Sequence, residues 1–152
     1  MASNRHLGRI VALQSLYEYE LRGSIGDMVD VKGIIGRNLE RYREAIDDRD
    51  FVDGLVNGVI AKQSELDEKL QPLAPEWPLD QIARVDRATL RIGLYELLFA
   101  ADSVPPKVAI NEAVELAKAF GSDNSSKFVN GVLGTAYRTL VEENEADGSA
   151  KV

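Results

Sequence analysis

The sequence predicts an all-α protein in which two packed helical bundles form one compact domain. Three observations predict it. Apolar residues recur at helical spacing along most of the chain, and no segment shows the alternation of a strand worth assigning. Prolines gather in residues 72–78, where they interrupt the helical pattern. The length of 152 residues suits a single domain, and 45% hydrophobic with 28% charged residues is ordinary for a globular chain.

The first half of the chain predicts three helices. The first ends at Gly23 and Gly26, the second covers residues 28–43, and the third covers residues 51–70. The first helix has one apolar stripe at helical spacing: Ile10, Leu13, Tyr17 and Leu21. Three acidic residues are candidate N-caps of the third helix: Asp47, Asp48 and Asp50.

Pro72, Pro75 and Pro78 surround Trp77 in a stretch that cannot be a helix interior. This stretch predicts the seam between an N-terminal helical subdomain, residues 1–72, and a C-terminal one, residues 73–141. Residues 84–101 are apolar nearly all round, which predicts a buried central helix. Residues 142–152 predict an acidic, disordered tail.

Two more helices are expected after Pro105-Pro106. One runs through residues 113–120, and Gly121 is its candidate C′ residue. The other begins after the polar run 122–125, which can cap it. Its expected core positions share one face: Val129, Val132, Leu133, Ala136 and Leu140.

Composition excludes most catalytic chemistry. Cysteine is absent, which removes thiol nucleophiles, disulfides and cysteine-ligated metals, and His6 is the only histidine. We therefore expect no catalytic residue, no metal site and no cofactor. No apolar run is long enough to span a bilayer and the start of the chain is polar, so a cytoplasmic protein is expected.

The net charge of −7 argues at first against a nucleic-acid partner. Residues 142–152 account for three of these negative charges and leave four on the rest of the chain. The first 17 residues contain Arg5 and Arg9 and no acid. A small basic end on an acidic body is therefore compatible with RNA binding, although two or three cations are a weak signal.

An arginine stripe and an aromatic residue each allow two interpretations. Arg84, Arg87 and Arg91 share a narrow arc of the central helix, where they can bind phosphate or, more commonly, form a solvated face paired with acids. Phe128 points about 100° away from the core direction of its helix. Its ring can offer a base a stacking surface beside a helix N-terminus, or it can pack against Phe120.

Three motifs follow one another in the second half of the chain: VDRATLRIGLYELL at 85–98, PPKVAINEAVELAKAFG at 105–121 and SSKFVNGVL at 125–133. They closely resemble the NusB family of transcription antitermination factors. ALQSLY at 12–17 and FVDGLVNGV at 51–59 extend the resemblance to about residues 5–138. The resemblance implies an all-α fold of two packed bundles and no catalysed reaction.

The resemblance also implies partners. NusB-like proteins pair with the ribosomal protein NusE, and the heterodimer binds boxA RNA and helps the transcription elongation complex through ribosomal RNA operons. A homodimer of the free protein is left open. Two other classes also stay open: a helical protein–protein adaptor with weak or lost RNA binding, and an enzyme that uses the arginine stripe as an anionic site.

The positions that match the family's motifs define a candidate site. His6 and Leu7 stand where arginines are typical of the family, and Asn124 stands where some relatives have aspartate. Tyr17 and Asp86 match the NusE-binding surface, and a core role for Tyr17 is the alternative. The residues implied in RNA binding are Arg5, His6, Arg9, Gln14, Asn124, Lys127 and Phe128.

Overall fold

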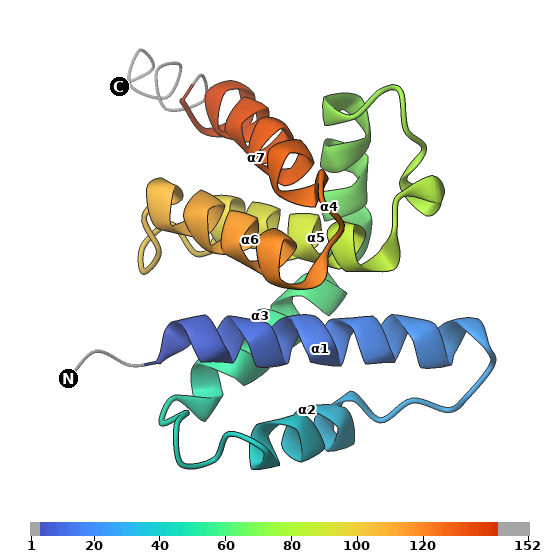
Figure 1. Cartoon of the computed structure of the whole chain (residues 1–152), viewed down its shortest axis with the longest axis vertical. Helices are drawn as coiled ribbons and strands as arrows, with labels where there is room; N and C mark the ends of the chain where they lie inside the picture. The colour runs from blue at the N-terminus through green and yellow to red at the C-terminus, as the bar shows by residue number, and fades with distance from the viewer. Residues whose placement is uncertain (1–3, 143–152) are drawn as a thin grey trace. The chain divides into compact units, whose positions relative to one another are not determined.

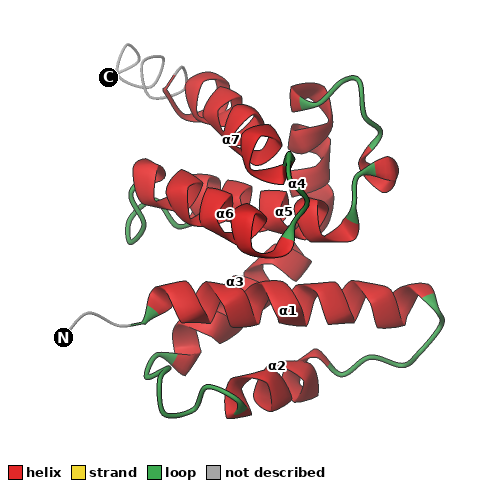
Figure 2. Ribbon diagram, in the orientation of Figure 1, coloured by secondary structure: helices red, strands yellow, loops and turns green. Residues whose placement is uncertain are grey.

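The computed structural model describes residues 4–142, and within this range it contains helices and loops and no strand (Figures 1 and 2). The all-α prediction is confirmed. The predicted acidic tail lies outside the described residues except for Glu142. The helices are α1 Arg5–Ser24, α2 Val31–Glu40, α3 Arg49–Ala61, α4 Gln63–Leu70, α5 Arg84–Phe99, α6 Pro106–Phe120 and α7 Ser125–Ala136. Shorter turns are the 3-10 segments Gln71–Leu73 and Leu79–Gln81 and the π turn Tyr137–Glu142.

The chain divides into two compact units, Met1–Ala61 and Lys62–Val152. The proline-rich seam at 72–78 therefore lies inside the second unit, later in the chain than the boundary between the units. The reason is α4, which packs against α5. Leu66 and Leu70 of α4 are buried, and Arg91 of α5 binds Asp67 of α4 through two hydrogen bonds of 2.8 and 2.9 Å.

The first unit consists of α1, packed against α2 and α3 (Figure 1). Its predicted apolar stripe is confirmed as buried only at Leu13, which is 2% exposed, since Tyr17 is 36% exposed and Ile10 and Leu21 are half-buried. Small residues form much of the real contact face. A side chain at Gly8 would lie 3.1 Å from the Phe51 ring of α3, and Ser15 Oγ accepts a 3.1 Å hydrogen bond from Asn38 Nδ2 of α2. The buried residues of α1 are Gly8, Arg9, Val11, Ala12, Leu13, Ser15 and Leu16.

Two helices of the sequence prediction differ in length from those observed. The second is shorter, ending at Glu40. The third divides at Lys62 into α3 and α4. The N-cap prediction is confirmed for Asp48, whose Oδ1 accepts a 3.0 Å hydrogen bond from the backbone N–H of Phe51.

The central helix of the second unit is α5, as predicted. It packs against α4, α6 and α7, and Leu90, Ile92 and Leu94 are each at most 1% exposed. Gly93 permits this close packing, since a Cβ there would lie 2.5 Å from Leu133 Cδ1 of α7. No helix within residues 4–142 is long and apolar enough to cross a membrane.

The connection from α6 to α7 brings polar residues next to α5. Gly121 is needed here for space and not for a left-handed conformation: its φ is −92°, and a Cβ would lie 2.6 Å from Ser125 Cβ. The predicted core face of α7 is confirmed for four of its five positions, which are buried: Val129, Val132, Leu133 and Ala136. Leu140 lies in the π turn and is half-buried.

Candidate nucleic-acid interface

The cations at the start of α1 are held on an aromatic ring. The Arg5 guanidinium lies 4.6 Å from the centre of the Phe51 ring, and the Arg9 guanidinium lies 5.1 Å from it. Arg5 Nη2 is also 3.6 Å from Asp48 Oδ2, and its side chain is 36% exposed. Arg9 is only 3% exposed. In this conformation Arg5 is open to a phosphate, whereas Arg9 is enclosed in the protein.

Phe51 is a residue whose role the sequence did not reveal. It opens the third predicted helix, 51–70, and the structure leaves it half-buried beneath two guanidinium groups. Cation–π contacts of this kind fix the direction of a long side chain as well as adding attraction. Because α1 and α3 are far apart in sequence, no local signal could have paired Phe51 with Arg5 and Arg9.

The other predicted residues of α1 lie at or near its surface. His6 is exposed in the first turn, and Gln14 is half-buried. Gln14 Oε1 is buried and accepts no hydrogen bond from the described residues. Tyr17 is exposed, so the alternative core role for it is wrong.

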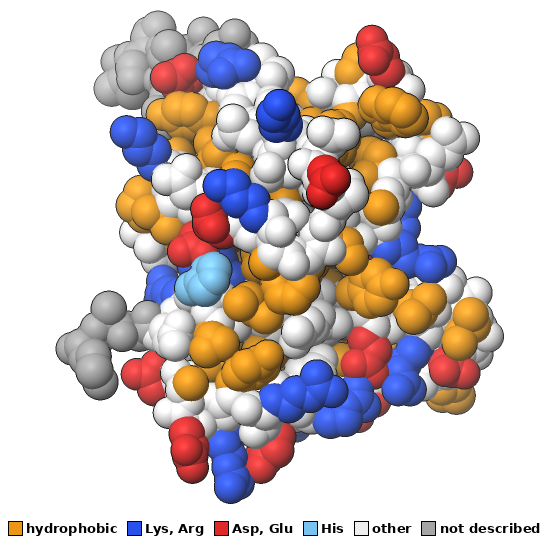
Figure 3. Space-filling view, in the orientation of Figure 1, with side chains coloured by type: hydrophobic (Ala, Val, Ile, Leu, Met, Phe, Trp, Pro, Cys, Tyr) orange, Lys and Arg blue, Asp and Glu red, His pale blue; other side chains and the backbone are white. Residues whose placement is uncertain are grey.

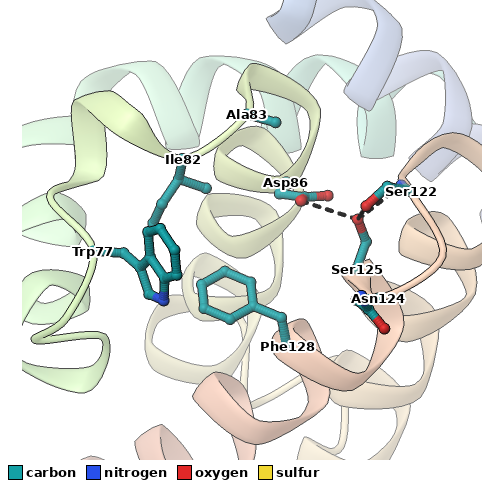
Figure 4. A pocket seen from close by; sticks show the side chains of 8 residues that line it. All are labelled: Trp77, Ile82, Ala83, Asp86, Ser122, Asn124, Ser125 and Phe128. Carbon is teal, nitrogen blue, oxygen red and sulfur yellow. Dashed lines mark hydrogen bonds between the residues drawn. The ribbon is translucent and has the colours of Figure 1, made fainter.

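The second unit has a pocket of about 350 Å³ between the loop before α5 and the N-terminus of α7 (Figure 4). It brings together three predicted residues: Asp86, Asn124 and Phe128. Lys127 is exposed on α7 and does not line it. The full lining is Trp77, Ile82, Ala83, Asp86, Ser122, Asn124, Ser125 and Phe128.

Phe128 is half-buried, which makes it less exposed than its angle on the helix predicted. Its ring lies beside the Trp77 indole in the pocket in Figure 4. Phe120, the other candidate neighbour, lines neither this pocket nor the adjoining hollow of about 310 Å³ that Trp77 and Phe128 also line. The interpretation that Phe128 packs on Phe120 therefore has no support.

A short hydrogen-bond chain forms the polar side of the pocket. Ser125 Oγ accepts a 2.8 Å hydrogen bond from the Ser122 N–H and donates one of 3.0 Å to Asp86 Oδ2. Asp86 Oδ1 is buried and has no donor among the described residues. Asn124, at the N-cap of α7, is exposed and its side chain makes no capping hydrogen bond.

The arginine stripe has a structural role: the predicted pairing with an acid is confirmed for Arg91, which binds Asp67 of α4, but the predicted exposure to solvent is wrong. Arg87 is 8% and Arg91 7% exposed, so this is not a solvated face. Arg87 Nη1 donates to the carbonyls of Leu79 and Ile82 at 2.8 and 3.2 Å, and Arg91 pairs with Asp67. Both guanidiniums are used within the protein, which argues against the hypothesis of an arginine-lined enzyme site.

The face of the molecule in Figure 3 shows no dominant basic patch among the described residues. On the face shown in Figure 3, acidic and basic side chains are interspersed among apolar ones. RNA recognition would therefore depend on a few placed residues and not on a broad positive field.

Comparison with known proteins decides the family. The model of the NusB family matches residues 6–138. The chain belongs to the NusB family. It is 45% identical over 148 residues to the transcription antitermination protein NusB of Chloroflexus aggregans, covering 97% of this chain and 95% of that protein. It is 46% identical over 146 residues to NusB of Roseiflexus castenholzii, covering 95% and 99%.

Solved structures agree with this assignment. NusB of T. maritima has a TM-score of 0.79 at 30% identity, covering 91% of this chain and 94% of that one. A chain in the crystal structure of antitermination factors NusB and NusE in complex with dsRNA has a TM-score of 0.76 at 27% identity, covering 88% and 96%. NusB proteins are transcription antitermination factors and not enzymes.

Proposed function

We propose that this chain binds boxA-type RNA as a heterodimer with NusE and supports transcription of ribosomal RNA operons by the elongation complex in the cytoplasm. The observation that supports RNA binding most directly is the pocket at the N-terminus of α7, where an aromatic ring, an exposed amide and a helix N-terminus meet. The relative solved with NusE and dsRNA supports both partners.

The RNA contacts divide by chemistry. Arg5, His6 and Lys127 are exposed or part-exposed and supply groups for the phosphate backbone. Phe128 stacks on a base. Arg9 acts indirectly, since its place over Phe51 helps to fix the ring beneath Arg5.

Two further polar groups complete the RNA site. Gln14 and Asn124 offer amide groups to the RNA, and the buried Gln14 Oε1 still lacks a donor among the described residues. Asn124 carries no negative charge, so it repels phosphate less than an aspartate would.

Tyr17 and Asp86 form the proposed contact with NusE. Tyr17 presents an exposed aromatic ring with a polar tip, a side chain common at interfaces. Asp86 is half-buried and lines the pocket, so its carboxylate offers the partner a hydrogen-bond acceptor there.

A gel-shift titration with boxA-type RNA, with and without NusE, tests the proposal. We expect weak binding by the chain alone, because Arg5 is the exposed guanidinium of its N-terminal motif and Arg9 is enclosed, and much tighter binding by the heterodimer. Tight binding without NusE at physiological salt would contradict the charge argument.

The burial of Arg9 favours one alternative, an adaptor that binds NusE but has weak or lost RNA affinity. A salt titration of the heterodimer separates the two. Phosphate contacts give a negative slope of log K against log salt, whereas an adaptor shows no measurable RNA affinity at any salt concentration.

A further inference from the structure

Trp77 is the only tryptophan of the chain, and it is 55% exposed in the loop between α4 and α5. A large ring left in water is a recurrent feature of binding surfaces, because it gains most from being covered by a ligand. The NusB assignment and the proposed RNA site give this residue no role.

The loop that carries Trp77 is held by a glutamine. Gln71 Nε2 donates to the carbonyls of Trp77 and Ala74 at 2.9 and 3.3 Å, and Gln71 Oε1 accepts from the Leu79 N–H at 3.0 Å. The Gln71 side chain thus binds backbone groups before and after Trp77 and holds the loop in place.

A buried arginine holds the same loop where it enters α5. Arg87 of α5 donates to the carbonyls of Leu79 and Ile82. An exposed ring on backbone fixed by five side-chain hydrogen bonds is preorganised, so little conformational freedom is lost when a ligand covers it.

Trp77 and Phe128 line the same two hollows, and their rings lie side by side in the larger one (Figure 4). The remaining apolar wall there is Ile82 with Ala83. A flat aromatic ligand in this pocket has an aromatic surface to stack on at each of the two rings. Lys127 and the N-terminus of α7 lie next to Phe128 in sequence, where a phosphate attached to such a ligand would be favoured.

We propose that Trp77 is a second stacking residue, and that Trp77 and Phe128 are the two walls of a slot for one unpaired base of the bound RNA. Gln71 and Arg87 are positioning residues of this slot. The inference rests on the proposed RNA-binding function and deepens it. Because both walls are aromatic and stacking accepts every base, the slot favours unpaired over paired nucleotides and selects weakly among bases.

A fluorine label on the single tryptophan tests the slot in the intact heterodimer. The chain is prepared with 5-fluorotryptophan, the NusE partner is left unlabelled, and the ¹⁹F spectrum is recorded before and after addition of boxA-type RNA. We expect the Trp77 resonance of the preformed heterodimer to shift when RNA is added, beyond any shift that NusE causes by binding at Asp86 in the same pocket. A resonance that moves on addition of NusE and then does not move on addition of RNA would assign the ring to a protein contact and overturn the proposal.

Substitutions measure how much Trp77 contributes to RNA affinity. Trp77→Leu in the heterodimer should weaken RNA binding by about 5- to 150-fold, the range for loss of one stacked base, without changing the slope of affinity against salt. Trp77→Phe should restore most of the affinity, which excludes a folding defect as the cause. Phe99→Leu, at the opposite end of α5 and 38% exposed, is the matched control and should bind RNA as the wild type does.

Gln71→Ala tests the positioning role separately. It leaves the indole in place but removes the hydrogen bonds that hold its backbone, so the ¹⁹F resonance should broaden and RNA affinity should fall by less than in Trp77→Leu. An unchanged spectrum and affinity would remove Gln71 from the slot.

These experiments distinguish a failure of the proposed base slot from a failure of the proposed RNA-binding function. If the wild-type heterodimer binds RNA while Trp77→Leu binds equally well and the ¹⁹F resonance does not move, the slot is wrong and the RNA-binding function stands. If the wild-type heterodimer binds no RNA, the proposed function itself fails.

Discussion

The start of α1 and the loop before α5 combine cationic or polar side chains with aromatic ones in opposite ways. At the start of α1 an aromatic ring, Phe51, supports two guanidiniums, one of which is enclosed. Before α5 a glutamine and an arginine support the backbone of a loop that exposes an aromatic ring, Trp77. In the first region one guanidinium, that of Arg5, is exposed to a ligand. In the second region an exposed aromatic ring, Trp77, is carried on backbone that side-chain hydrogen bonds hold in place.

This difference indicates how the protein divides its recognition of RNA. A chain with net charge −7 and one guanidinium open in its N-terminal motif gains little from counterion release. Stacking does not depend on net charge, so on the proposed function a preorganised aromatic region would compensate for a depleted basic one. The comparison predicts that the salt dependence of RNA affinity and the stacking of bases depend on different residues.

The largest expected effect concerns α5, the buried helix that follows the loop with Trp77. Leu94 of α5 is 0% exposed, so Leu94→Ala leaves a cavity and should reduce the free energy of unfolding by about 2–5 kcal/mol. Denaturant melts measure it. Leu98→Ala, at a half-buried position of the same helix, is the control and should cost less. A loss below about 1 kcal/mol for Leu94→Ala would mean that α5 is not the core of this unit.

Phe128→Ala is expected to separate binding from stability. RNA affinity of the heterodimer should fall by about 5- to 150-fold, while the slope of affinity against salt stays as in the wild type. Because Phe128 is only half-buried, its stability cost should stay below the roughly 3–5 kcal/mol of a fully buried phenylalanine. Unchanged affinity in a folded variant would remove Phe128 from the site.

The two arginines of α1 should behave differently from each other. Arg5→Gln should lower the magnitude of the salt slope by about 0.7, the value for one phosphate contact on a single strand. Arg9→Gln should lower the melting temperature more and the salt slope less, because Arg9 is enclosed over Phe51. Binding isotherms at several salt concentrations, with thermal melts, measure both. Equal slopes for the two variants would show that Arg9 also reaches phosphate.

The smallest effect tests charge pairing elsewhere in the first unit. Burial by itself raises the pKa of Glu18, but the hydrogen bonds and charges of Arg37 and Arg22 outweigh it and hold that pKa below its ordinary value. The pairing therefore stabilises the fold above the ordinary glutamate pKa, and this stability is lost as the pH falls through the lowered value.

Glu18→Gln removes that contribution. The variant should melt slightly below the wild type near neutral pH, and the difference should shrink on acidification from about pH 6 to about pH 3. Thermal melts across this range measure it. A difference that stays constant with pH would show that packing of the side chain, and not its charge, is responsible.

The sequence by itself determined the features that depend on residues near one another in the chain. Helical spacing predicted the all-α class and the burial of α5, an acidic N-cap predicted the start of α3 at Asp48, and three contiguous motifs identified the family. Each of these is set by contacts within a few turns of one helix or by an unbroken run of residues.

The tertiary structure decided which side chains meet across helices. It buried a face of α1 that combines small residues such as Gly8 and Ser15 with Leu13, and it used Arg91 to bind Asp67, which lies 24 positions earlier. It also set Trp77 beside Phe128. A periodic pattern states which face of a helix is apolar, but it does not state which helix covers that face, because the pairing depends on the packing of the whole unit.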